Sequence, residues 1–171
     1  METWQAITAR RNVREFADKP LAPGDLDRIL EAARRAPSAK NRQPWDFVVV
    51  TDRARLGELS KVWVGAGHVA GAAAAIALVA PVPADERERG RIQFDLGQAV
   101  MSILLAATDL GIGSCHAGVG DHEAARRVLG HPEDRYCAYM VSLGRPAGRP
   151  LAPIERPDRR AFGDVVHRER W

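Results

Sequence analysis

Three arginines near the N-terminus are the first residues whose type and spacing suggest chemistry. Arg10, Arg11 and Arg14 lie within five residues of one another, beside the amide side chain of Asn12. Guanidinium groups bind phosphate and carboxylate oxygens through charge-assisted hydrogen bonds, each contributing roughly 1.5–3 kcal/mol. By itself the cluster fits two interpretations equally well, a binding site for a small anion or a solvated basic surface.

Two loops carry further groups that could contact a flat polar ligand. Residues 37–45 (PSAKNRQPW) combine a hydroxyl, two amides and two prolines, which stiffen the chain and offer donors and acceptors to a heterocycle edge. Residues 111–120 (GIGSCHAGVG) contain glycines that let the backbone approach a ligand closely. In isolation, the first loop also fits a helix stop followed by a strand, and the second a helix C-cap followed by a strand.

Composition limits the classes of function. The 171 residues fit one domain, 1–171, and the net charge of +3 is too small to indicate nucleic-acid binding. Two cysteines and scattered histidines give no metal-ligand spacing, and we interpret Cys115 and Cys137 as reduced thiols of a cytoplasmic protein. The N-terminus is polar and charged, so we expect no signal peptide. Residues 62–82 lack charged side chains but are rich in Ala and Gly, and predict a buried element rather than a membrane span.

Periodicity and capping residues place these segments on secondary structure. They predict helices over residues 3–10, 52–60 and 86–110. Two further helices are predicted, one from an N-cap at Asp25 to a stop at Pro37 and one from Asp121 to about Leu129. Strands are predicted over 45–51, 112–117 and 136–143, whereas 73–80 fits a strand or a helix end.

The C-terminal segment combines charge with apolar side chains. Arg156, Arg159 and Arg160 precede several apolar residues, namely Phe162, Val165, Val166 and Trp171. Because exposing such residues to water is unfavourable, we expect this tail to cover another surface, for example that of a partner subunit.

Motifs of other enzyme classes are missing. The chain contains no GxSxG, HExxH or GxxxxGK[ST] sequence, and no GxGxxG after a strand. Five segments instead occur in an order that resembles the nitroreductase family of FMN proteins: RRNVREF, PSAKNRQPWDFVVV, GIGSCHAG, VSLGRP and RRAFGDVVHRERW. The resemblance spans nearly the whole chain, and the second segment is its most specific part.

This resemblance implies an α+β fold with a central mixed β-sheet flanked by helices. It also implies a homodimer in which the C-terminal extension crosses to the partner, and two FMN molecules at the interface. The cofactor-binding residues implied are Arg10, Arg11, Asn12, Arg14, Pro37, Ser38, Ala39, Asn41, His116, Ala117, Gly118, Val119, Arg159 and Arg160.

Each group has an implied role. Arg10, Arg11 and Asn12 would hold the phosphate and ribityl end of FMN, and Arg14 would lie at the pyrimidine N1/O2 edge. Residues 37–41 would reach the flavin from the other subunit, 116–119 would face the N5 side, and 159–160 would close over the phosphate. The chain departs from the family pattern at Asn12, where serine is usual, at His116, where many members have Trp or Pro, and in the short segment 61–90, for which no flavin contact is implied.

The implied activity is electron transfer from NADH or NADPH through FMN to an electron-poor acceptor such as a nitroaromatic or a quinone, in ping-pong order. The chemistry would occur at FMN N5, so no catalytic side chain and no metal are expected. Three alternatives remain open: a flavin-dependent dehalogenation, a flavin-fragmenting reaction, and a flavin-binding module without turnover.

Overall fold

A four-stranded antiparallel sheet with strand order β1–β2–β4–β3 forms the centre of the molecule. In the computed structural model, which describes residues 1–171, the strands are β1 (Asp46–Val50), β2 (Ala74–Pro81), β3 (Gly113–Gly118) and β4 (Arg135–Gly144). The strand β2 is central because it pairs with both β1 and β4, whereas β3 lies at an edge and pairs only with β4.

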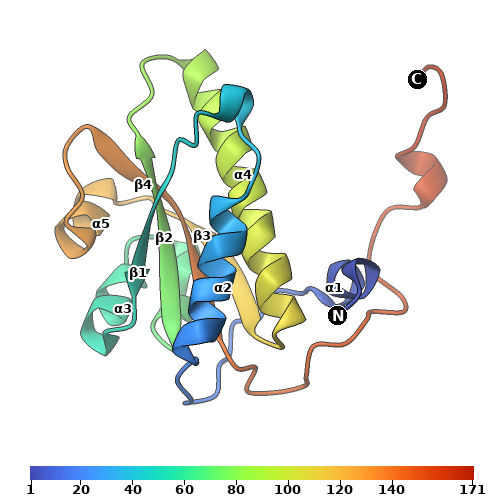
Figure 1. Ribbon diagram of the computed structural model, residues 1–171, viewed down its shortest axis with the longest axis horizontal. Coiled ribbons are helices and arrows are strands. Elements are labelled where there is room, and N and C mark those ends of the chain that lie inside the picture. Colours follow the sequence, from blue (N-terminus) through green and yellow to red (C-terminus); the bar gives the residue numbers. More distant parts are fainter.

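Helices cover both faces of this sheet. They are α1 (Thr3–Ala9), α2 (Pro23–Arg34), α3 (Arg53–Leu59), α4 (Glu86–Asp109) and α5 (His122–Leu129), with short 3₁₀ helices η1 (Ala39–Asn41), η2 (Val64–Val69) and η3 (Phe162–Asp164). Figure 1 shows α2 and α4 against one face, with α3 and α5 on the other side.

The apolar run of β2 is explained by burial on both faces. Ile76 and Leu78 belong to the hydrophobic cluster under α2 and α4, and the alternate residues Ala75, Ala77 and Val79 belong to the cluster under α3, η2 and α5. Successive side chains of a strand point to opposite faces, so a strand covered on both sides is apolar throughout. This pattern settles the segment 73–80 as a strand.

The long helix α4 presents its apolar stripe to the sheet as the periodicity predicted. Ile92, Leu96, Ala99 and Ile103 are buried, and the side chain of Asp85 caps the helix by accepting a hydrogen bond from the Glu88 N–H at 2.7 Å. One buried residue, Asp95, interrupts the apolar stripe.

The predicted α+β class is confirmed, and two details differ from expectation. Within this chain the sheet strands pair only antiparallel, and parallel pairing is limited to an isolated bridge between Asn12 and Ser114. Asp25 is not an N-cap, because α2 begins at Pro23, whose fixed φ suits the first helical position. The Asp25 carboxylate instead accepts a hydrogen bond from Arg145 at 3.0 Å.

The C-terminal tail leaves the rest of the molecule. It runs beside α1, where the Ile154 N–H donates to the Thr8 carbonyl at 3.0 Å, and then projects outward (Figure 1). Phe162 is 71% and Trp171 98% exposed, so the tail finds no apolar surface to cover within this chain. None of the helices has the length and the apolar composition needed to span a bilayer.

Candidate functional site

The arginine-rich segment lies along the open edge of β3. The Val13 N–H donates to the Ser114 carbonyl at 2.9 Å, next to the parallel bridge between Asn12 and Ser114. Val13 itself is buried. These contacts fix the backbone of residues 10–14, so that the flanking polar side chains stay at the surface.

This attachment depends on a glycine opposite Val13. A methyl group at Gly113 would lie 2.7 Å from the Val13 Cγ1 atom, closer than a side-chain contact allows. We therefore expect Gly113→Ala to displace the 10–14 segment and to lower the free energy of unfolding by about 1–3 kcal/mol. Chemical denaturation measures the loss.

The matched control for that variant is Gly57→Ala, because a methyl group at Gly57 in α3 meets no atom within 4 Å. We expect this control to keep or slightly raise stability, since alanine is the better helix former. Equal stability of the Gly113→Ala protein and the wild type would show that Val13 does not pack as described.

Two of the three arginines, Arg11 and Arg14, line a shallow hollow, and all three lack an acidic partner. None of Arg10, Arg11 and Arg14 forms a salt bridge. Arg10 donates to the Asn12 side-chain oxygen at 3.4 Å, and Arg11 donates to the Arg149 carbonyl at 2.7 Å. A hollow of about 370 Å³ is lined by Arg11, Asn12, Val13, Arg14, Glu15, Pro146, Gly148 and Arg149. The arrangement leaves several guanidinium N–H groups free for an anion.

The second half of β3 continues this edge. The side chain of His116 is exposed and Ala117 is buried, while a methyl group at Gly118 would meet no atom within 4 Å. Backbone with open space beside it can approach a flat ring closely. The structure thus brings residues 10–14 together with residues 116–119 on one continuous edge.

A hydrogen-bonded chain lies next to that edge. The Ser142 hydroxyl donates to the Cys115 carbonyl at 3.1 Å, and its oxygen lies 2.8 Å from His68 Nδ1. Ser142 thus links His68 to β3, and the Nε2 atom of His68 is buried without a partner. Burial, together with the positive charge of Arg14, lowers the pKa of His68 below its ordinary value. Burial also raises the pKa of the Cys115 thiol, so this cysteine is not an activated nucleophile.

The lowered pKa of His68 predicts that the stability of the fold depends on pH. Because its folded-state pKa is lowered, the unfolded chain takes up a proton first as the pH falls through about 6.5, and the stability contributed by neutral His68 is lost below that pH. The loss is at most about 1.4 kcal/mol per pH unit. We expect His68→Gln to flatten the fall in Tm between pH 7.5 and 5.5. A Tm that falls as steeply in the variant as in the wild type would contradict this role.

The loop 37–45 lies at a different place, beside the N-terminal half of α4. Lys40, Asn41 and Gln43 have positive φ values of 54°, 54° and 49°, which non-glycine residues rarely adopt. The loop is held from within by Ser38, whose hydroxyl accepts from the Gln43 N–H at 2.9 Å. It is held from outside by the buried Asp95 carboxylate, whose two oxygens lie 3.1 and 3.2 Å from the Ala39 nitrogen.

One chain does not bring all the expected site residues together. Asp95 holds the 37–45 loop, whereas Asp109 pairs with the N-terminal amine just before α1. These two aspartates are fourteen positions apart in α4, which corresponds to about 21 Å along the helix. Arg159 and Arg160 lie on the projecting tail, bonded only to nearby backbone carbonyls. The site residues therefore form three separate groups.

Comparison with known proteins gives the family. The sequence model of a protein family described as the nitroreductase family matches residues 7–67 and 61–145 of this chain. The chain belongs to this family. A protein from Archaeoglobus fulgidus, provisionally named an NADH dehydrogenase/NAD(P)H nitroreductase, is 37% identical over 99% of both chains. An NADH dehydrogenase from Thermus thermophilus is 32% identical over 88% of this chain and 92% of its own.

Solved structures agree with this membership. An FMN-dependent nitroreductase from Clostridium difficile is similar with a TM-score of 0.84 and 26% identity, covering 97% of this chain and 98% of that one. The nitroreductase fold therefore extends over nearly all residues, including the arginine-rich edge of β3.

Sequence reasoning missed two residues that hold segments of the candidate site in place. Asp95 is a carboxylate inside the apolar stripe of α4, and that mismatch with its neighbours was the available signal. His68 is the one titratable residue in the uncharged stretch 62–82. Its bond to Ser142 joins segments far apart in the sequence, which local patterns do not reveal.

Proposed function

We propose that this nitroreductase-family protein is an FMN-dependent oxidoreductase that takes electrons from NADH or NADPH. The observation that carries the proposal is a group of three arginines without acidic partners beside the open, glycine-containing edge of β3. The names of the relatives, which include NADH dehydrogenase and FMN-dependent nitroreductase, support the same reaction class. Both cysteines are free thiols, in keeping with the reducing cytoplasm we propose as its location.

The residues present fit FMN in charge and shape. Arg10, Arg11 and Asn12 would hold the phosphate and ribityl chain, because neither arginine pairs with a carboxylate and Arg11 and Asn12 line the hollow. Arg14 would lie at the pyrimidine edge. The backbone from His116 to Val119 would support the ring, since the space beside Gly118 is open.

FMN, when bound, supplies a ring that accepts hydride from the nicotinamide and passes electrons to an acceptor. The chain's contribution is positioning and charge. Arg14 is cationic at any physiological pH, so it would stabilise negative charge that develops at the pyrimidine edge, as a preorganised electrostatic group. His68, held neutral by burial and by Arg14, adds no competing positive charge. Protons can come from solvent, so no acid–base side chain is required.

A second copy of the chain would complete the site. Asp95, which holds the 37–45 loop, lies about 21 Å along α4 from Asp109, which binds the N-terminal amine beside α1. This separation favours contact of Pro37, Ser38, Ala39 and Asn41 with the flavin of a partner. Arg159 and Arg160 would close over the phosphate. The exposed apolar residues are those that such a homodimer would bury: Trp4, Ile7, Phe94, Met101, Phe162 and Trp171.

The electron acceptor would enter beside η2. The Val62 carbonyl accepts from the N–H groups of Gly120 and Asp121 at 3.0 and 2.8 Å, which ties the start of this segment to the end of the β3 edge. Next to it, Trp63 is half-exposed and Val64 is 94% exposed. We propose these two side chains as an apolar wall for a planar acceptor such as a quinone or a nitroaromatic.

Steady-state kinetics test this function. With FMN-loaded protein, NAD(P)H oxidation should depend on added quinone or nitroaromatic, and double-reciprocal plots at several acceptor concentrations should be parallel, as ping-pong order requires. Intersecting lines would exclude ping-pong order. Absence of NAD(P)H oxidation with every acceptor would exclude the proposed reductase activity.

A further inference from the structure

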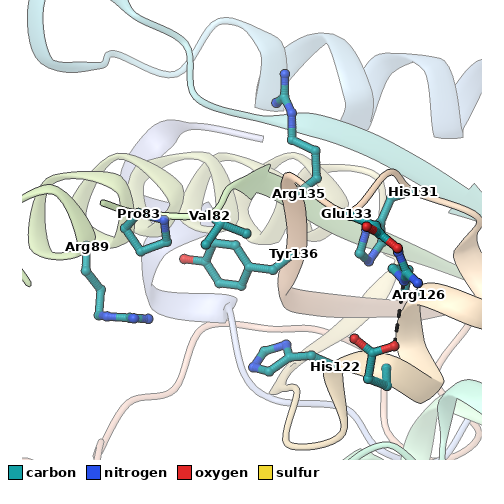
Figure 2. A pocket seen from close by; sticks show the side chains of 10 residues that line it. Val82, Pro83, Arg89, His122, Arg126, His131, Glu133, Arg135 and Tyr136 are labelled. Atoms are coloured by element: carbon teal, nitrogen blue, oxygen red, sulfur yellow. Dashed lines mark ion pairs between the residues drawn. The ribbon is translucent and has the colours of Figure 1, made fainter. Parts of the chain in front are cut away.

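A second hollow lies at the opposite end of the sheet from the arginine-rich edge. Its volume is about 540 Å³, and it forms where β2 ends and where β4, α4 and α5 begin. None of the residues that we assign to FMN lines it. Figure 2 shows the side chains around this space, with Tyr136 projecting between Pro83, Arg89 and His122.

The hydroxyl of Tyr136 is a buried donor without a partner. It forms no hydrogen bond within the protein. Burial raises the pKa of Tyr136, so the hydroxyl keeps its proton and remains a donor at neutral pH. An unsatisfied buried polar group costs about 1–3 kcal/mol, a cost that a ligand acceptor would remove.

Two further donors face the same space. Arg89 uses its Nε atom to bind Glu86 at 3.0 Å, and its terminal nitrogens donate to no protein acceptor. The His122 ring packs edge-on against Tyr136 with ring centroids 5.7 Å apart, and it occupies the first position of α5, where the helix dipole is positive. Together with the Tyr136 hydroxyl, these groups offer hydrogen bonds and positive charge.

The two acidic side chains of this hollow share one arginine. Arg126 pairs with Glu133 at 2.9 Å and with Glu123 at 3.7 Å. His131 is 9% exposed, its Nδ1 atom donates to the Pro132 carbonyl at 3.1 Å, and its Nε2 atom is therefore a buried acceptor without a partner. Val82 and Pro83 supply apolar surface on the other side. Arg135 is paired with Asp46 at 2.9 Å. On the side near Pro83, the groups that still have hydrogen bonds to donate are therefore the Tyr136 hydroxyl and the terminal nitrogens of Arg89.

From this arrangement we infer that the hollow is a binding site for a small organic anion, a carboxylate or phosphate attached to an apolar body. The anionic group would bind Arg89, His122 and the Tyr136 hydroxyl, and the apolar part would contact Val82 and Pro83. The volume is in the range typical of small-molecule sites. This inference does not depend on flavin chemistry, because its residues are separate from those assigned to FMN.

Titration of the FMN-loaded protein tests the inference. Benzoate and inorganic phosphate serve as probes, with chloride at equal ionic strength as the reference, and binding is followed calorimetrically. We expect saturable binding of benzoate or phosphate, with the relative affinity showing whether the site prefers a carboxylate or a phosphate. Arg89→Gln and Tyr136→Phe should each weaken binding about tenfold or more. Arg87→Gln, an exposed neighbour on the same helix turn that does not line the hollow, should bind like the wild type.

Stability measurements separate a lost contact from a damaged fold. Tyr136→Phe removes an unsatisfied hydroxyl, so the variant should be as stable as the wild type or more stable while it binds the probe less well. Absence of saturable binding, or equal weakening by Arg87→Gln and Arg89→Gln, would overturn the inference. Neither result bears on the flavin site, whose test is NAD(P)H oxidation.

Discussion

Replacing Arg10 and Arg14 together with alanine is expected to weaken FMN binding by roughly 10²–10⁴-fold, since each charge-assisted hydrogen bond contributes roughly 1.5–3 kcal/mol. Neither arginine has a carboxylate partner, so no internal ion pair is lost and the fold should persist. The single change Arg14→Ala should show part of this effect. Quenching of FMN fluorescence during titration gives the Kd of each variant.

Arg87→Ala is the matched control for these substitutions, because Arg87 is an exposed arginine of α4 that lines neither hollow. This substitution also removes one positive charge, but far from the arginine-rich edge. It should leave the Kd for FMN within about twofold, since long-range charge effects are screened at physiological salt. An unchanged Kd in the double variant would remove these two arginines from the cofactor site.

Removing residues 150–171 is expected to convert the proposed homodimer into monomers that do not retain FMN. The tail contributes little to the fold of its own chain, where Ile154 makes one backbone hydrogen bond to α1 and Phe162 and Trp171 are exposed. Burying each large apolar side chain against a partner would contribute about 1.5–3 kcal/mol. Analytical ultracentrifugation measures the oligomeric state, and the flavin absorbance of the purified protein measures retention.

Point variants show whether the dimer depends on the apolar side chains of the tail or only on the presence of the tail. Phe162→Ala with Trp171→Ala should weaken the dimer, whereas Arg168→Ala with Arg170→Ala should not, because exposed charges contribute little. A truncated protein that stays dimeric and yellow would refute the proposed exchange of the tail. A truncated protein that unfolds would contradict the independence of the fold from the tail.

The elements of the fold were predictable where one local signal dominates. The 3–4 spacing of Ile92, Leu96, Ala99 and Ile103 predicted α4, and Asp121 correctly predicted the start of α5. Asp25 misled the prediction for α2, because proline competes with capping residues for the first turn, and the carboxylate is used by Arg145. The bond between Asp25 and Arg145 joins residues 120 positions apart, so a local sequence pattern does not contain it.

The candidate site was predictable in part. The resemblance identified the arginines and the β3 edge, which the structure places side by side through Val13 and Ser114. Local sequence could not show that Asp95 fixes the 37–45 loop or that His68 binds Ser142, since both contacts arise only when the chain folds. The hollow around Tyr136 likewise combines the starts of three elements that are separate in the sequence.

The most direct test of the central claim is the absorption spectrum of the purified protein with added FMN, recorded before and after anaerobic addition of NADH and then NADPH. We expect a bound flavin whose visible band bleaches with at least one nicotinamide and returns when a quinone or nitroaromatic is added. Protein that does not bind FMN, or that binds it without reduction by either nicotinamide, would contradict the proposed oxidoreductase function.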